Sequence, residues 1–385
     1  MTLFDDNPLS PPEQNPGATL SDNQSAESPS PDPLAPLLPG DPISYVAANP
    51  AAAHPADSRL PEDLRIPWSW VHLLVFVIYV LVTQFAIATV VIGYYSVYRH
   101  LPQKQLKHLL ESDPKVLVVT TILMFALIFL FLYVTLAALR NMPFWRTLGW
   151  RKLKADPTTG KSRPWVYFLS GCGLSIFVAL ASSRVKDAEN APIQEFFKSR
   201  NGAMLLMAMA VFVAPLVEET IFRGYLYPTL ARIISVLSRF IAADSARAGR
   251  VSVLTSAIVM ATNYGVFRSG RLALTWGVFS LLTLFGIILL VILIIGNDSA
   301  RADRAGVFSS IILTGVLFGL VHAPQLGKNW ALVSLLILVG VIFTFARAWT
   351  GTVLASFLLH LGYNSMIAVT SIIATKGFTH MPPHP

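Results

Sequence analysis

Long apolar runs, separated by short polar stretches, dominate the chain after Trp68. Most of them reach the roughly 20 residues that an α-helix needs to cross a bilayer. A helix also satisfies its own backbone hydrogen bonds, as hydrocarbon requires. One run, 251–267, is weakened by three consecutive polar positions, Thr262, Asn263 and Tyr264. The pattern therefore predicts an all-α, polytopic membrane helical bundle of eight or nine transmembrane helices. The runs fall at residues 69–97, 115–139, 164–182, 202–222, 251–267, 272–296, 306–323, 330–347 and 351–374.

The first 64 residues have a different character. They contain 13 of the 26 prolines and ten of the 21 acidic residues, with Arg59 as their one basic residue. Such a segment has too little apolar surface to offset the entropy of ordering, so we predict a disordered, acidic, Pro-rich tail over residues 1–64. It is not a signal peptide, because no apolar core follows its acidic start.

Composition and charge support this assignment. The chain is 54% hydrophobic and only 13% charged, whereas soluble domains are usually about a quarter charged. The net charge of +8 lies in loops between apolar runs, which is a topology signal and no indication of a nucleic-acid partner. Cys172 is the single cysteine, which excludes a disulfide within the chain and a multi-cysteine metal site.

Two groups of basic residues orient the chain. The loop 140–163 holds seven of them against one Asp, and five more arginines follow Glu219, a stretch we also interpret as a loop. Both are predicted to be cytoplasmic by the positive-inside rule. The two groups are Arg140, Arg146, Arg151, Lys152, Lys154, Lys161 and Arg163, and Arg223, Arg232, Arg239, Arg247 and Arg250.

Two adjacent carboxylates, Glu218 and Glu219, end an uncharged apolar stretch. Ionised carboxylates in hydrocarbon cost several kcal/mol unless they are partnered. Glu219 and Arg223 are four residues apart and can pair on one helix face, whereas Glu218 points about 100° away. The pair is interpreted either as a structural ion pair or as part of a site, and Glu218 as a general base.

Two further apolar segments each carry a pair of candidate site residues at the same spacing of four residues. Phe318 and His322 form one pair, and His360 and Asn364 form the other. Each pair alone is compatible with helix packing. Together with Glu218, the two histidines and the asparagine could form one pocket that activates water and stabilises an oxyanion. Glu218, His322 and His360 are also a zinc-type ligand set, and without a His-Glu-x-x-His motif the presence of a divalent metal such as zinc stays open.

Glu-Glu-x-x-x-Arg, Phe-x-x-x-His and His-x-x-x-Asn, in this order on apolar segments, resemble the CAAX protease and bacteriocin-processing family of intramembrane endopeptidases. The resemblance covers residues 201–372, which we expect to form the catalytic membrane domain, after N-terminal transmembrane helices over 66–200. It implies that Glu218 and His322 activate the hydrolytic water, that His360 and Asn364 stabilise the oxyanion, and that Glu219, Arg223 and Phe318 support the site. The family has been described both as metal-dependent and as metal-free, and we favour the second description.

The chain departs from the family in one respect, because about 100 residues separate Glu219 from His322. Two spans in this interval would make the two helices antiparallel. Both residues lie about 15 positions from the start of their apolar runs. They can then meet only if one helix starts deeper in the membrane or bends, for which Pro215 offers a place.

These patterns predict an intramembrane endopeptidase with a membrane-associated substrate, such as a prenylated or leader-peptide-bearing protein. A non-catalytic protein of the same fold, with an immunity or scaffold role, is the alternative, and an ion-coupled transporter is a third hypothesis. We expect a multi-pass protein of the inner membrane in a bacterium or of the endoplasmic reticulum in a eukaryote. The sequence leaves the substrate and the oligomeric state open.

Overall fold

The computed structural model describes residues 60–100, 113–155, 160–185, 199–243 and 299–378, and a few single positions between 102 and 109 and at 250. Within these ranges every regular element is helical, and seven helices are long and apolar enough to cross a membrane. Outward-facing apolar side chains such as Leu81 and Phe85 are 64% and 75% exposed, as expected for a surface solvated by lipid. The predicted polytopic helical bundle is confirmed, while the predicted spans 251–267 and 272–296 lie outside the described residues.

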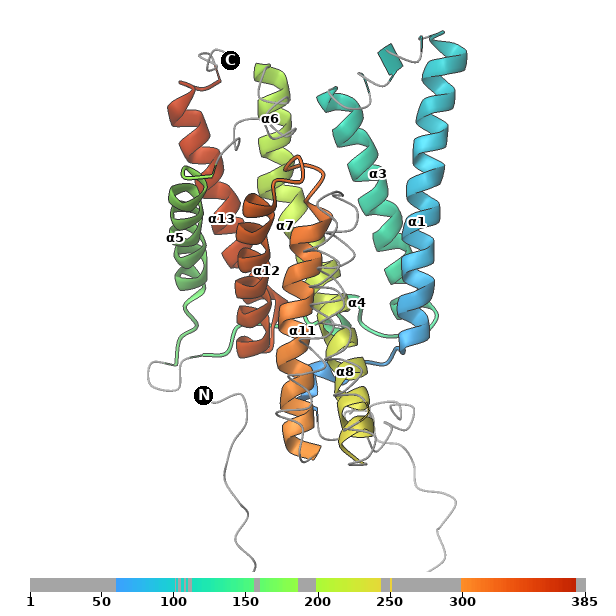
Figure 1. Cartoon of the computed structure of the whole chain (residues 1–385), viewed down its shortest axis with the longest axis vertical. Helices are drawn as coiled ribbons and strands as arrows, with labels where there is room; N and C mark the ends of the chain where they lie inside the picture. Colours follow the sequence, from blue (N-terminus) through green and yellow to red (C-terminus); the bar gives the residue numbers. More distant parts are fainter. Residues whose placement is uncertain are drawn as a thin grey trace, which may run out of the picture. The chain divides into compact units, whose positions relative to one another are not determined.

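The elements follow the apolar runs closely (Figure 1). Most helices begin and end within a few residues of the predicted boundaries. In chain order they are η2 (Glu62–Leu64), α1 (Trp70–Gly93), η3 (Tyr94–Tyr98), α3 (Pro114–Leu132), η4 (Tyr133–Ala138), α4 (Phe144–Thr147), α5 (Pro164–Ser182), α6 (Arg200–Ala208), η7 (Met209–Val213), α7 (Ala214–Glu219), η8 (Thr220–Leu226), α8 (Tyr227–Ala242), α11 (Ser299–Val321), α12 (Trp330–Thr350) and α13 (Val353–Ala374).

The helix that carries the paired glutamates is longer than predicted. It runs without interruption over 42 residues, Arg200–Ile241, so the arginines at 223, 232 and 239 lie on a helix and not in a loop. Two π-helical segments, η7 and η8, flank α7. Pro215 lies at the start of α7 and has no N–H to donate to the preceding turn. The wider π turn accommodates this local defect, and such turns are frequent at functional sites.

Helix α11 lies antiparallel to this long helix. Asp303 pairs with Arg239 at 3.2 Å, and toward the other end Phe318 packs on Phe222 with ring centroids 5.3 Å apart. Helix α11 also begins at Ser299, seven residues before the predicted run at 306. This earlier start places its last turn level with α7.

Helices α12 and α13 complete the wall around α7. They form a tight antiparallel hairpin whose turn is Gly351, with a φ of 71°, a value that glycine adopts at little cost. Helix α12 packs against α11, and α13 packs against both α5 and α7. The first residue of α8 is Tyr227, whose ring lies 5.9 Å from the Arg347 guanidinium of α12. Since α8 has 16 residues, it extends about 24 Å beyond the level of this contact.

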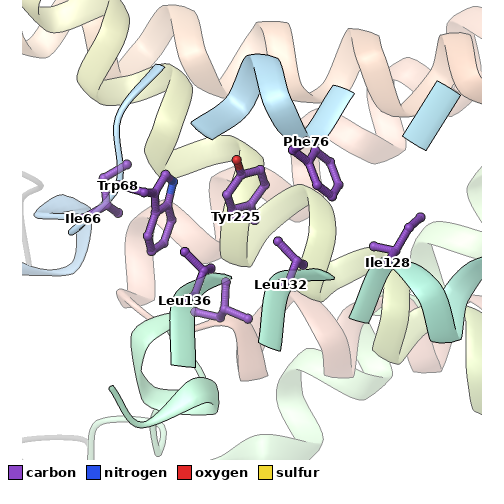
Figure 2. Close-up of a cluster of buried hydrophobic side chains, with 8 residues drawn as sticks. Ile66, Trp68, Phe76, Ile128, Leu132, Leu136 and Tyr225 are labelled. Atoms are coloured by element: carbon purple, nitrogen blue, oxygen red, sulfur yellow. The ribbon is translucent and has the colours of Figure 1, made fainter. Parts of the chain in front are cut away.

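An aromatic cluster attaches the first two spans to the long helix. Tyr225 of η8 is fully buried between Trp68 and Phe76, with ring centroids 5.4 and 4.9 Å away. Figure 2 shows Leu132 and Leu136 beside the same ring. The Tyr225 hydroxyl also lies 2.7 Å from Nδ1 of His72. Helices α1 and α3 therefore contact the chain two residues after Arg223.

Residues 60–64 differ from the expectation of a tail that is disordered as far as residue 64. Leu60 and Leu64 are buried against Tyr227 and neighbouring apolar side chains. Asp63 accepts a 2.6 Å hydrogen bond from the fully buried Arg347. The sequence could not indicate this contact, because its partners are 284 positions apart. Residues 1–59 lie outside the described part of the chain.

Two glycines of α5 give a matched test of this packing. A Cβ on Gly171 would collide with the carbonyl oxygen of Leu359, whereas a Cβ on Gly173 would meet nothing within 4 Å. We therefore expect Gly171→Ala to destabilise the bundle by about 1–3 kcal/mol through overpacking. Gly173→Ala should leave the stability unchanged or slightly higher, because alanine has the better helix propensity. The temperature at which half of the detergent-purified protein stays monodisperse in gel filtration measures this. Equal effects of the two substitutions would contradict the α5–α13 packing.

Candidate active site

The predicted ion pair between Glu219 and Arg223 is present and fully buried. Nη1 of Arg223 lies 2.9 Å from Oε1 of Glu219, and neither side chain is exposed. The i, i+4 spacing brings the two groups together on one helix face. Since removing one member would leave an uncompensated charge in an apolar interior, this pair must stay intact in the folded bundle.

Helix α12 supplies the remaining polar partners of Arg223. Its Nη2 donates to the carbonyl oxygen of Gly340 at 2.9 Å, and its Nε donates to Oγ1 of Thr344 at 3.2 Å. The Thr344 hydroxyl in turn donates to the same Gly340 carbonyl at 2.7 Å. The guanidinium fork is thus held by two groups of one neighbouring helix and by one carboxylate.

Nothing in the sequence indicated that α12 would supply hydrogen-bond partners for Arg223. Thr344 is a common residue in an apolar run, and a backbone carbonyl carries no residue-type signal. Helix α12 was therefore recognisable only as a span. Gly340 also allows α12 to approach α11 closely, because an added Cβ would lie 2.8 Å from the Gly315 carbonyl oxygen.

Aromatic rings cover the charged centre. The Arg223 guanidinium carbon lies 4.6 Å from the ring centroid of Phe318 and 5.4 Å from that of Phe343. Both distances are within the range of a cation–π attraction. Phe318, predicted as a supporting residue, also packs on His322 and His360, with ring centroids 4.7 and 5.9 Å apart.

His360 of α13 bridges the two glutamates. Its Nδ1 lies 2.9 Å from Oε1 of Glu219, and its Nε2 lies 4.0 Å from Oε2 of Glu218. Because the Glu219 carboxylate is paired with a cation, it accepts a hydrogen bond, and Nδ1 of His360 is the donor. This bond fixes the ring so that its other nitrogen faces Glu218.

His322 approaches Glu218 from the end of α11. Its Nδ1 lies 2.7 Å from the carbonyl oxygen of Phe318, and its Nε2 lies 3.8 Å from Oε1 of Glu218. A carbonyl oxygen only accepts, so Nδ1 carries the hydrogen and Nε2 faces the carboxylate. The predicted antiparallel helices therefore do bring Glu218 and His322 together, because α11 starts early and ends at this level.

Glu218 is less enclosed than Glu219. Its side chain is 16% exposed, against 0% for Glu219, and that of His322 is 18% exposed. Separations of 3.8 and 4.0 Å from the two imidazoles leave room for a small molecule to hydrogen-bond to more than one of these groups. The arrangement can therefore hold a water molecule beside a carboxylate base.

Asn364, the fourth residue of the predicted catalytic set, binds backbone. Its Nδ2 donates at 2.7 Å to the carbonyl oxygen of Ala210 in η7. Asn364 lies one turn beyond His360 on α13 and secures that helix to the π-helical segment before α7. Its predicted role at an oxyanion stays a prediction.

The same residues can be compared with the needs of a metal ion. Glu218, His322 and His360 offer the chemistry of a zinc site. Over the described ranges, however, no group of three His, Cys, Asp or Glu side chains is arranged to hold a metal ion. The residues as placed do not fit the ligand set, and the chemistry below is derived from the side chains alone.

Comparison with protein families supports the motifs. A family model described as "Type II CAAX prenyl endopeptidase Rce1-like" matches residues 200–299 and 298–366. The match contains Glu218, Glu219, Arg223, Phe318, His322, His360 and Asn364. No curated protein and no solved structure matches the chain.

The buried pair can be tested by a double-mutant cycle. We expect Arg223→Met to destabilise the protein by about 3–5 kcal/mol, because it leaves the Glu219 carboxylate buried without its cation. Adding Glu219→Gln should restore part of the loss, since both charges are then absent. Thermal unfolding of the two single variants and the double variant in detergent measures the coupling. Strictly additive losses would show that the two side chains act independently.

Proposed function

Because its C-terminal region, residues 200–366, belongs to the type II CAAX prenyl endopeptidase Rce1-like family, we propose that this protein is an intramembrane endopeptidase. The family is one of proteases, and the seven apolar helices of the described ranges make the chain an integral, multi-pass membrane protein. The observation that carries the proposal is the position of Glu218. It is the partly accessible carboxylate, and the imidazoles of His322 and His360 face it at 3.8 and 4.0 Å.

In the proposed reaction Glu218 is the general base. Its carboxylate takes a proton from a water molecule that the Nε2 atom of His322 helps to orient. The water oxygen then attacks the carbonyl carbon of the scissile peptide bond, and the carbonyl oxygen becomes an oxyanion. Glu218 returns the proton to the leaving nitrogen as the C–N bond breaks, which yields a free carboxyl group and a free amine.

The supporting residues hold this arrangement in place. Glu219 orients His360 through its Nδ1, and Arg223 pairs with the Glu219 carboxylate and connects it to α12. Asn364 uses one amide hydrogen on Ala210, and the proposal assigns its other one to the oxyanion. For His360 to join it, Nε2 must also carry a proton, because Nδ1 already donates to Glu219. Groups fixed before the substrate arrives stabilise charge without reorganising, which is the main source of rate in such sites.

The proposed substrate is a membrane-associated protein or peptide. Glu218 lies within a candidate membrane span, so a scissile bond must reach it beside hydrocarbon. A lipid-modified segment, such as a prenylated C-terminus, or an apolar leader peptide meets this requirement. Cleavage of each kind by the purified protein would separate these substrate classes.

Two substitutions test the mechanism directly. We expect Glu218→Gln and His322→Ala each to lower cleavage of a membrane-associated peptide by about 10²–10⁴-fold, because each removes a proton-transfer or water-binding group. Glu62→Gln and His100→Ala are matched controls at exposed positions and should cleave as the unmodified protein does.

Unchanged cleavage in either site variant would exclude the mechanism. If no substrate is cleaved, and the same substitutions leave a cellular phenotype intact, the non-catalytic role in immunity or scaffolding is favoured instead. Gel filtration of each variant separates loss of activity from loss of folding.

The metal question has its own test. We expect cleavage to persist after dialysis against a zinc chelator, because the proposed steps use side chains only. Elemental analysis of the active protein should then show no stoichiometric zinc. Loss of cleavage on chelation, with recovery on adding zinc, would instead assign Glu218, His322 and His360 as metal ligands.

A further inference from the structure

The loop between the second and third described spans combines exposed positive charge with exposed indoles. We define this basic loop as residues 139–155 and 160–163. Four of its cations, Arg146, Lys152, Lys154 and Lys161, are exposed. Trp145 is 47% exposed, and Trp165, just beyond the loop, is 59% exposed. No acidic side chain lies within the described part of the basic loop.

The basic loop lies at the border of the bilayer. It joins two candidate membrane spans, Pro114–Ala138 and Pro164–Ser182, so both of its flanks start at the membrane surface. Tryptophan is enriched at this level because its ring is apolar and its N–H is polar. Lysine and arginine next to it meet the phosphate groups of the lipids.

The middle of the basic loop is fixed to the site helix. Leu148 is fully buried, and a Cβ on Gly224 would lie 2.7 Å from its carbonyl oxygen. Trp150 donates from Nε1 to Oγ1 of Thr220 at 3.1 Å, next to Glu219 in the chain. The exposed cations on either side of Leu148 and Trp150 therefore extend from a segment that is fixed to the site helix.

The α12–α13 turn holds the same region from a second side. The amide of Val353 donates to the Gly149 carbonyl at 3.0 Å. The Thr352 hydroxyl donates to the Arg151 carbonyl at 2.6 Å. A surface fixed at two points presents its charges in one arrangement, which lowers the entropy lost when a ligand binds.

We propose that the basic loop is a binding surface for anionic phospholipid headgroups of the bilayer in which the protein resides. Exposed cations flanked by interfacial tryptophans fit a negatively charged membrane surface better than they fit an acidic protein, which would need no indoles at bilayer level. The proposal concerns lipid binding and stands whether or not the site cleaves peptides.

A triple variant tests the proposal on the full-length protein in detergent. Arg146→Gln, Lys152→Gln and Lys154→Gln together should weaken binding of short-chain phosphatidylglycerol on the order of 100-fold at low salt. Thermophoresis of the labelled protein measures the binding. The neutral probe, phosphatidylcholine of the same chain length, should bind weakly to both forms. High salt should also weaken phosphatidylglycerol binding to the unmodified protein, because exposed charges are screened.

The matched control neutralises two exposed cations elsewhere. Arg184 follows α5, and Lys328 lies in the α11–α12 connection; both are outside the basic loop. Arg184→Gln with Lys328→Gln should leave phosphatidylglycerol binding within twofold of the unmodified protein. Because a ligand of the folded state stabilises it, phosphatidylglycerol should also raise the unfolding temperature of the unmodified and control proteins but not that of the triple variant.

Three results would overturn the proposal. The first is binding of phosphatidylglycerol by the triple variant that is as tight as binding by the unmodified protein. The second is a loss of binding in the control variant that is as large as the loss in the triple variant. The third result is tighter binding of an acidic peptide, poly-glutamate, than of short-chain phosphatidylglycerol, which would assign the surface to an acidic protein partner.

Discussion

The ion pair of Glu219 and Arg223 is the constraint on which the arrangement of the other helices depends. Two unexposed charges 2.9 Å apart gain enough to offset their desolvation only when further groups satisfy the remaining donors and acceptors. In this bundle those groups come from α12, through Thr344 and Gly340, and from α13, through His360. These contacts place two other helices around α7, and they leave Oε2 of Glu219 without a hydrogen-bond partner among the described residues.

The same requirement explains why small residues surround the pair. For the Arg223 guanidinium to reach a backbone carbonyl of α12, the helices must pack closely. Gly340 and Gly315 allow α12 and α11 to pack closely, because a Cβ on either would lie within 3 Å of atoms of the facing helix. In lipid, where apolar burial gives little drive for association, close van der Waals packing and interhelical hydrogen bonds hold helices together. The buried polar groups and the close contacts at small residues therefore both hold these helices together.

The sequence predicted those features that depend on neighbours along the chain. Apolar run length located the described spans, and the spacing of four residues identified the Glu219–Arg223 pair. The approach of His322 and His360 to Glu218 was predicted from the few polar residues in apolar runs and from the resemblance to a known family. The sequence could not indicate the contacts of Asp63 with Arg347 or of Trp150 with Thr220, because these join residues far apart and of unremarkable type. The apolar pattern also predicted that the helix of the paired glutamates ends at residue 222. The helix instead continues into α8, which is amphipathic, packs on α11 and has no apolar run of its own.

The two adjacent glutamates divide the tasks of structure and chemistry. Glu219 has no exposed surface, and one of its oxygens contacts both Arg223 and His360, so moving this carboxylate would disturb the contacts of more than one helix. Within the described residues, Glu218 forms no ion pair with an arginine or lysine, and the imidazoles of His322 and His360 face it at distances that leave space for a water molecule. A base must gain and lose a proton in every cycle, and its surroundings must tolerate both states. In the proposed mechanism, the fixed position of Glu219 supports its neighbour, because it holds His360 in place while the charge on Glu218 changes.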